Sequence, residues 1–281
     1  MRRWLRGLAL AAIVGAMSCP VAATGAVGAI FALGSSGRAL GMGGAFMALA
    51  DDEGCVLYNP AALGWTQAIS LTSLLASGFG GTAHGVIGIS VPYFGVNGFL
   101  LDSGAIPIND GSFRYASQGF VASVGVPIGP VALGVRGRLL RVSAPTDGAG
   151  WAVDPAVAVS IDSLRVAVMI EAAASGAVVY DSGASEEWER SIRLGAAMTL
   201  SPSPDVLWSA AFEAAGLFST APQLMAGVEA WIGGLGARVG FDGRGATFGL
   251  SVRFSSLQFD WGYAMRSDLG DSHRVSFTLR F

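Results

Sequence analysis

An alternation of apolar and polar residues is clearest near the C-terminal end of the chain. Five successive segments carry it: 222–232, 235–242, 245–254, 257–266 and 271–281. In the second of these, Leu235, Ala237 and Val239 share one face, and Arg238 lies on the other. Successive side chains of a strand point to opposite faces. Each segment is therefore predicted to be a β-strand with one apolar face.

Nine earlier segments follow the same pattern less strictly: 67–76, 83–91, 94–102, 113–126, 131–142, 151–160, 164–173, 190–200 and 205–213. Most have about the 9–11 residues that a tilted strand needs to cross a bilayer. The odd-numbered connections between the predicted strands are longer than the even-numbered ones. Short turns on one side and longer loops on the other are typical of outer-membrane barrels. We therefore expect both termini at the short-turn end, in the periplasm of a Gram-negative-type bacterium.

Composition favours a membrane barrel over a soluble enzyme. Hydrophobic residues make up 52% of the chain and charged residues 13%, against about 25% charged residues in an average soluble domain. Beyond the N-terminus, no apolar run reaches the roughly 20 residues of a spanning helix. All basic residues are arginines, and they form no basic patch for nucleic acid. The fold prediction is all-β: a transmembrane antiparallel barrel of 14 strands over residues 67–281.

The first 23 residues are predicted to be a signal peptide. Arg2, Arg3 and Arg6 precede a short apolar stretch, and small residues end at Ala23. Cys19 leaves a lipoprotein cleavage site as the alternative. Removal of Cys19 with the signal peptide would leave a single thiol and no internal disulfide.

Residues 24–66 lack the strand pattern and are rich in glycine and small apolar residues. Ser36 is suited to cap a short helix over residues 38–49. A barrel of 14 strands is about 28 Å across, too wide for its own side chains to fill. We therefore expect residues 24–66 to lie in the lumen as a plug, or hatch.

Two motifs at opposite ends of the chain resemble a known family. They are GRALGMGGAFMALADDEGCVLYNPAALG in the N-terminal segment and LQFDWGYAMRSDLGDSHRVSFTLRF at the C-terminus. Both are similar to the FadL superfamily, especially its PorV/PorQ-like branch. The resemblance implies a 14-stranded barrel with an N-terminal hatch. For function it implies either lateral release of hydrophobic molecules through the wall or, in the PorV branch, service in protein secretion.

The resemblance also marks candidate ligand or hatch residues, namely Phe46, Asp51, Asp52, Tyr58, Asn59 and Pro60. Asn59 and Pro60 fit either a fixed turn or a hatch hinge. Asp51 and Asp52 are expected to anchor the hatch to arginines of the wall, with ion binding as the alternative. The expected lumen arginines are Arg136, Arg138, Arg165, Arg193, Arg238 and Arg253.

Asn97 and Gly98 interrupt the third predicted strand, which fits either a lateral opening or a plain glycine bend. Gly41, Gly43 and Gly44 resemble a phosphate loop only superficially, because no strand precedes them and no lysine follows. His84 and His273 are the only histidines, and Ser272 beside His273 would point to the opposite face of its strand. We therefore expect no enzyme activity, no metal site and no cofactor.

The leading functional hypothesis is binding or passage of small hydrophobic molecules through the hatch and a lateral opening. The alternative is a non-transporting barrel that docks protein partners in secretion or envelope assembly; an apolar patch with Tyr180 and Trp188 on the 174–189 connection would favour it. Expected partners are outer-membrane lipid and the barrel assembly machinery, which reads a C-terminal aromatic residue such as Phe281.

Overall fold

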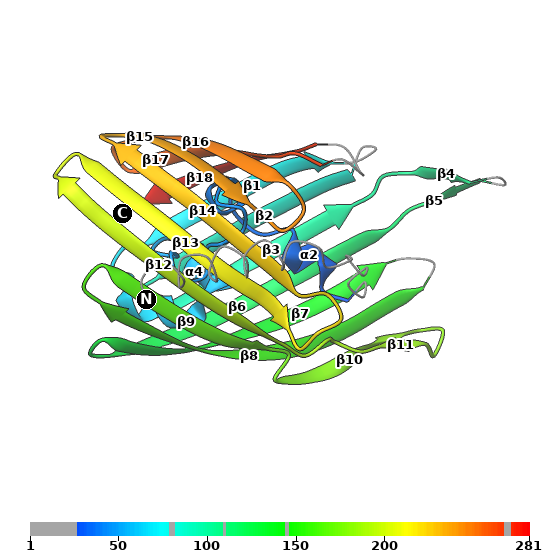
Figure 1. The fold of residues 1–281 in the computed structure, drawn as a ribbon. Coiled ribbons are helices and arrows are strands. Elements are labelled where there is room, and N and C mark those ends of the chain that lie inside the picture. The colour runs from blue at the N-terminus through cyan, green and yellow to red at the C-terminus, as the bar shows by residue number, and fades with distance from the viewer. Residues whose placement is uncertain (1–26, 79–81, 109–110, 144–145, 267–270) are drawn as a thin grey trace, which may run out of the picture.

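Fourteen antiparallel strands form a closed barrel (Figure 1). The computed structural model describes residues 27–78, 82–108, 111–143, 146–266 and 271–281. The strands of the wall are β1 (Ser70–Gly78), β2 (Thr82–Val91), β3 (Phe94–Asp102), β6 (Ala116–Ile128), β7 (Val131–Ser143), β8 (Asp147–Ile161), β9 (Leu164–Glu171), β12 (Ser191–Ser203), β13 (Val206–Leu217), β14 (Gln223–Ile232), β15 (Leu235–Phe241), β16 (Ala246–Phe254), β17 (Leu257–Ala264) and β18 (Ser272–Arg280). Each pairs with the next in the wall, and β1 pairs with β18.

The predicted 14-stranded barrel is confirmed, and the predicted spans differ from these strands by a few residues at their ends. Two short hairpins were not predicted. One joins β4 (Ile106–Ile108) to β5 (Gly111–Phe113), and the other joins β10 (Ala174–Tyr180) to β11 (Ser185–Glu186). Both belong to long connections and project at one end of the barrel (Figure 1). In the described part of the chain, no helix has the length and apolar character needed to cross a membrane.

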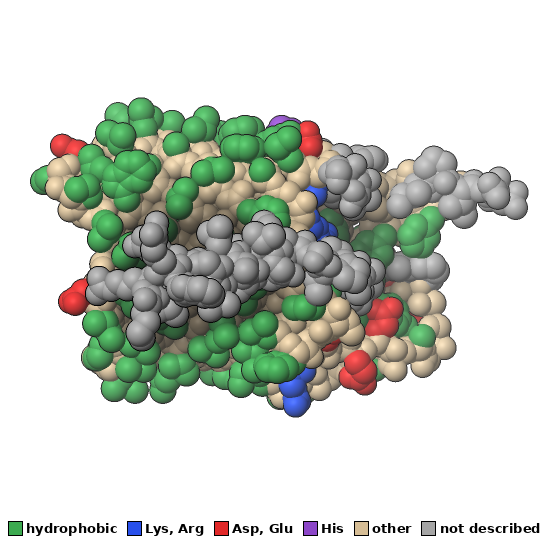
Figure 2. Space-filling model, in the orientation of Figure 1, with side chains coloured by type: hydrophobic (Ala, Val, Ile, Leu, Met, Phe, Trp, Pro, Cys, Tyr) green, Lys and Arg blue, Asp and Glu red, His purple; other side chains and the backbone are tan. Residues whose placement is uncertain are grey.

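The outer surface of the barrel is apolar. Leu75 and Ile87 are each 71% exposed, and hydrophobic side chains cover much of the barrel surface in Figure 2. Inward positions of the wall carry buried polar groups such as Glu229, Arg238 and Asp260. Exposed apolar rows around a barrel with polar side chains inside are the arrangement that lipid requires.

The two ends of the barrel differ. At one end, the short-turn end, six connections of two residues each join β2 to β3, β6 to β7, β8 to β9, β12 to β13, β14 to β15 and β16 to β17. Five of these turns contain a residue with positive φ, at Tyr93, Gly129, Asp162, Gly233 and Ser255, as tight hairpin turns favour. The start of β1 and the end of β18 lie at this end, where Ile69 and Phe281 exchange two backbone hydrogen bonds.

Residues 27–66, here called the inner segment, lie inside the barrel. They form α2 (Ala29–Ala32), α3 (Gly37–Gly41), α4 (Cys55–Tyr58) and the 3-10 helix η2 (Pro60–Trp65). Figure 1 shows α2 and α4 within the ring of strands. Most of the segment is buried, and its apolar side chains form one cluster with inward residues of the wall.

The predicted helix over residues 38–49 is wrong in length. Ser36 does cap α3, since its Oγ accepts a hydrogen bond from Ala39 N at 3.3 Å, but the helix ends at Gly41. Gly43 follows with φ of +69°, and a Cβ there would lie 2.4 Å from the carbonyl oxygen of Phe241 on β15. The left-handed glycine turns the chain along the wall at a distance that no side chain would permit.

Candidate functional site

A chain of ion pairs crosses the lumen side of β7, β8, β9, β12 and β13. Asp154 accepts from Arg136 Nε at 2.7 Å and from Arg138 Nη2 at 2.7 Å. Arg136 also reaches Glu171 at 3.1 Å, and Arg193 then bridges Glu171 to Glu213. All six side chains are at most 20% exposed. Buried charges of this kind persist only when they are paired.

This network holds the inner segment through backbone groups. Glu213 Oε2 accepts from the backbone N–H of Phe46 at 3.0 Å and of Met47 at 2.9 Å. On the other side, Arg136 Nη1 donates to the carbonyl oxygen of Leu57. Arg165 similarly donates to Ala50 O at 2.8 Å. The wall therefore fixes the position of the segment at several separate points.

A second charged cluster centres on Arg38 of the inner segment. Its Nε and Nη2 donate to the two carboxylate oxygens of Glu229 on β14, at 2.8 and 2.7 Å. Its Nη1 donates to Asp51 at 2.6 Å and to Asp52 at 2.7 Å. Arg238 on β15 also donates to Glu229, at 2.9 Å. A fork of planar donors suits several carboxylates at once.

The structure thus gives Asp51 and Asp52 a different partner from the expected one. Their close partner is Arg38, which precedes Asp51 by 13 residues in the same segment. Arg38 in turn pairs with Glu229 of the wall. The only wall arginine recorded near Asp52 in the described chain is Arg280, at 3.8 Å. The sequence did not reveal this because Arg38 lies in the glycine-rich motif, away from any strand.

Four of the other predicted hatch residues pack together or against the segment itself. Phe46 and Tyr58 meet edge to face with their ring centroids 5.3 Å apart, and the Arg38 guanidinium lies 5.2 Å from the Phe46 ring. Asn59 Nδ2 donates to Met47 O at 2.9 Å, and Pro60 begins η2. These contacts give the four residues a structural setting inside the segment.

Glu53 of the inner segment has a strongly raised pKa. It is buried, and the Asp52 carboxylate lies beside it, so the pKa of Glu53 rises to about 8. Thr278 Oγ1 donates to its Oε1 at 2.7 Å, and Arg280 Nη2 lies 3.6 Å from its Oε2. Glu53 therefore links the segment to β18 in a way that depends on its protonation.

The remaining predicted arginines also face the lumen. Arg165 on β9 lies over the ring of Trp65, at 5.1 Å. Arg253 on β16 lies over Trp231, at 4.4 Å, and donates twice to Gln258 Oε1. Arg253 is more exposed than the others because it lies close to the short-turn end.

Asn97 and Gly98 lie in an unbroken part of the wall. β3 pairs residue by residue with β2 on one side and with β6 on the other through both positions. Asn97 points inward and is 1% exposed. The described ladder therefore contains no opening at these two residues, and the chain bends nowhere that would separate β3 from a neighbour.

The ladder is interrupted elsewhere, between β9 and β12. Ala172 has φ of +49°, and the pairing with β8 shifts by two residues between β9 and β10. β12 pairs with β9 only as far as Ser191. Beyond that point residues 172–177 and 187–190 face each other with no recorded backbone hydrogen bond, within the described range 146–266. We call these two stretches the wall break.

Side chains close the wall break in place of strand pairing. Trp188 Nε1 donates to Gly176 O at 3.0 Å, and Arg190 donates to Ala172 O and Ala173 O at 3.3 and 3.0 Å. The Trp188 ring is buried in the lumen, stacked on Phe31 of α2 with centroids 6.3 Å apart. The inner segment therefore touches the residue that closes the wall.

An apolar groove of about 540 Å³ lies beside the wall break. Its lining includes the outward-facing Phe120, Leu139 and Trp151, together with Ala177 of the break itself. A Cβ on Gly176 would lie 2.4 Å from Trp151 Nε1. Gly176 thus lies between two indoles, Trp151 on the lipid side and Trp188 on the lumen side.

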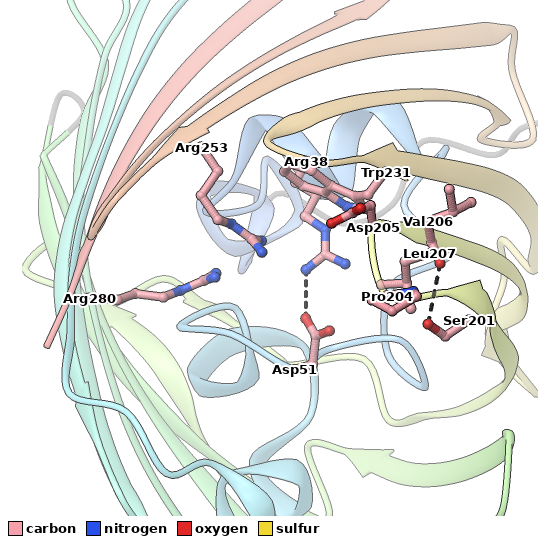
Figure 3. A pocket seen from close by; sticks show the side chains of 11 residues that line it. Arg38, Asp51, Ser201, Pro204, Asp205, Val206, Leu207, Trp231, Arg253 and Arg280 are labelled. Atoms are coloured by element: carbon pink, nitrogen blue, oxygen red, sulfur yellow. Dashed lines mark hydrogen bonds and ion pairs between the residues drawn. The ribbon is translucent and has the colours of Figure 1, made fainter.

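A second cavity, of about 450 Å³, opens at the short-turn end and is polar (Figure 3). Arg38 and Asp51 of the inner segment form part of its lining, and Trp231, Arg253 and Arg280 line it from the wall. Arg280 was not among the predicted site residues. Its inward position on the last strand was visible in the sequence, but nothing there indicated that the segment would leave a cavity beside it.

Among the described residues, His84, His273 and Cys55 lie in separate environments. His84 is buried against Phe99 in the lumen, whereas His273 stacks on Tyr263, a side chain of the outward face. Burial raises the pKa of the Cys55 thiol, which disfavours the thiolate. In the part of the chain that the structure describes, no three His, Cys, Asp or Glu side chains are grouped to hold a metal ion. Cys19 and the predicted signal peptide lie outside the described residues.

Comparisons with known proteins identify the fold. Searches of protein-family models and of curated proteins give no match. Among solved structures, the CymD monoaromatic hydrocarbon channel is similar over 89% of this chain and 98% of its own, with 11% identity and a TM-score of 0.60. The Ralstonia pickettii toluene transporter TbuX covers 88% and 97%, with 9% identity and a TM-score of 0.54. A Pseudomonas aeruginosa FadL homologue covers 88% and 98%, with 10% identity and a TM-score of 0.51. The chain therefore has the fold of these barrels.

Proposed function

We propose that this protein is an outer-membrane channel of the FadL type that passes small hydrophobic molecules. The fold shared with CymD, TbuX and the FadL homologue supports this proposal, as does the apolar outer surface. The inner segment serves as the hatch, and the short-turn end faces the periplasm. Phe281 at the end of β18 presents the terminal aromatic residue that the barrel assembly machinery reads.

The wall break is the observation that carries the proposed route. On the lumen side, Trp188 lies in an apolar cluster that includes Phe31, Leu140 and Val178. On the lipid side, the groove at Ala177 and Trp151 continues the apolar surface. Between them the wall is held by side-chain hydrogen bonds, which a rotamer change can break without unzipping a strand. A hydrophobic molecule leaving the lumen would pass here, into lipid.

The docking alternative has less support. It predicted an exposed apolar patch that includes Tyr180 and Trp188. Trp188 is 7% exposed, because its ring points into the lumen and not away from the barrel. The 174–189 connection therefore lacks the larger of the two aromatic rings that a partner protein would bind.

The test is uptake of toluene by cells whose outer membrane contains the protein. We expect the wild type to raise uptake above that of cells without it. Trp188→Ala removes the ring that closes the wall break, so uptake is expected to rise several-fold further. Trp208→Ala is the matched control, because Trp208 lies on the lipid-facing side of β13 and is 52% exposed.

Two outcomes would contradict the proposal. Uptake that is the same with and without the wild-type protein would exclude passage of this molecule class. Equal rates for Trp188→Ala and Trp208→Ala, with a working wild type, would place the route elsewhere in the barrel. Heat-modified migration on gels checks that each variant is a folded barrel.

A further inference from the structure

The polar cavity at the short-turn end differs in chemistry from the apolar groove. Its volume is about 450 Å³, and it is bounded by the inner segment on one side and by the wall on the other (Figure 3). The lining residues are Arg38, Asp51, Ser201, Pro204, Asp205, Val206, Leu207, Trp231, Gly233, Arg253 and Arg280. Three guanidinium groups face a space that an uncharged hydrocarbon would not fill favourably.

The three arginines differ in how fully they are paired. Arg38 donates to Asp51, Asp52 and Glu229, so its donors are used. Arg253 makes hydrogen bonds only to a neutral amide oxygen, that of Gln258, among the described residues.

Arg280 has the least satisfied guanidinium of the three. Its Nη2 is buried without a hydrogen-bond partner in the described structure. The nearest carboxylate oxygens, of Asp52 and Glu53, lie 3.8 and 3.6 Å away, beyond hydrogen-bond length. Arg253 and Arg280 therefore both retain donors for a further acceptor.

The geometry favours an anion over a metal ion or an uncharged ring. In Figure 3 the Arg253 and Arg280 side chains reach from the wall toward the Arg38–Asp51 pair. Guanidinium groups bind carboxylate and phosphate oxygens through paired N–H donors. Asp205, at the turn between β12 and β13, also lines the cavity, on the side of Trp231, whereas Arg253 and Arg280 approach from the other side (Figure 3). An anion is therefore expected on the Arg253 and Arg280 side.

Asp51 occupies the position of a competing carboxylate. Its side chain is 47% exposed, whereas Asp52 and Glu229, the other acceptors of Arg38, are 1% and 0% exposed. It is the one carboxylate of this cluster that a molecule entering the cavity meets directly. Trp231 and Leu207 add an apolar wall that suits a ring or short chain behind the charged group.

We propose that this cavity is a binding site for a small organic anion, a carboxylate or phosphate held by Arg253 and Arg280 with its apolar part against Trp231. Bound there, the anion lies next to the Arg38–Asp51 pair and competes with Asp51 for Arg38. The site is separate from the proposed hydrocarbon route, because the cavity lies at the short-turn end and the route crosses the wall at residues 172–177 and 187–190.

The test is calorimetric titration of the full-length protein in detergent at pH 7 and low salt, with benzoate and phenyl phosphate as probes. We expect saturable binding with one site per chain. Arg253→Gln/Arg280→Gln should weaken the affinity at least tenfold. Asp51→Asn should strengthen it several-fold, because a competing charge is removed. Arg244→Gln is the control, an exposed arginine at the long-connection end, and should bind like the wild type.

The two probes distinguish the source of the anion, since the tighter one identifies a carboxylate or a phosphate ligand. If the double variant does not fold, the single change Arg253→Gln decides in the same way. Absence of saturable binding to the wild type, or equal affinity in Arg253→Gln, would overturn the proposal. Displacement of bound benzoate by an equal concentration of toluene would also overturn it, because an uncharged ring offers the guanidinium groups no acceptor. None of these results depends on whether toluene crosses the membrane.

Discussion

The two parts of the inner segment meet the wall in different ways. Residues 36–66 are held by charged and backbone contacts, such as Arg38 to Glu229 and Glu213 to Phe46 N. Residues 27–33 meet it through rings: Phe31 contacts Phe99 edge to face and stacks on Trp188. Hydrogen-bonded ion pairs have narrow geometry, while apolar contacts tolerate sliding. We therefore expect α2 to shift at the wall break more readily than residues 36–66.

The largest expected effect comes from breaking the charged attachment. Glu229→Ala removes the carboxylate shared by Arg38 and Arg238 and leaves two buried cations without it. Breaking one partner of a buried pair costs about 3–5 kcal/mol. We expect that loss in the free energy of unfolding, measured by urea titration of the protein in vesicles. Glu187→Ala, at an exposed position, should change it by less than about 0.5 kcal/mol. A similar change for the two variants would show that the cluster does not hold the segment.

Loss of the apolar contacts of α2 is expected to lower the free energy of unfolding by a smaller amount, and its effect is expected to be local. Phe31→Ala removes the ring between Phe99 and Trp188, with a loss of about 3 kcal/mol at most for a site that can partly collapse. Hydrogen exchange should rise in residues 27–33 and 187–190 and stay low in residues 36–66. Exchange that rises over the whole inner segment would contradict the division into two parts.

A smaller loss in the free energy of unfolding is expected from adding a side-chain atom at Gly43, which lies against Phe241 of β15. Gly43→Ala forces an alanine to positive φ and places its Cβ against the Phe241 carbonyl, for about 2 kcal/mol. Gly129→Ala is the matched control, because Gly129 has φ of +63° with nothing within 4 Å of a Cβ. The difference between the two variants in urea titration measures the packing contribution alone. Equal losses would mean that only backbone strain is being measured.

A pH dependence is also expected for the fixed part of the segment. Glu53 has a pKa of about 8 in the fold, against an ordinary value near 4.5, so the folded state favours its protonated form. The stabilisation is complete below the ordinary value and is lost as pH rises toward 8. Thr278 and Arg280 face Glu53 and offset part of the loss. The urea concentration at the unfolding midpoint should decrease in the wild type as the pH is raised from 5 to 9. It should decrease less in Glu53→Gln. Equal slopes would assign the dependence to other groups.

The strands of the barrel could be predicted from the sequence, because each is a local pattern of period two. Residues 235–241 and 246–254 show this, since alternating exposure there follows the alternation of apolar and polar residues in the sequence. The inner segment was harder. Its helix was predicted to extend to residue 49, but Gly43 ends it by a contact with β15 that lies almost two hundred residues away in the chain.

The partners inside the lumen could not be predicted, because they depend on distances between segments. Asp51 was assigned to wall arginines, yet the nearer cation is Arg38. Trp188 was expected on an exposed loop, yet the two-residue shift at Ala172 turns that part of the chain inward. Asn97 and Gly98 interrupt the pattern and fitted either a lateral opening or a glycine bend, whereas the strand pairing is interrupted at residues 172–177 and 187–190, which the pattern did not mark.

The hydrogen bonds between Ile69 and Phe281 set an order of events during assembly. The wall closes only when β1 and β18 pair, so the ring stays open until these two strands meet. Residues 27–66 precede β1 and contact wall strands from β3 to β18. We therefore expect the segment to be enclosed as the seam forms, with the strands assembling around it, since a finished ring would offer no side from which to insert it.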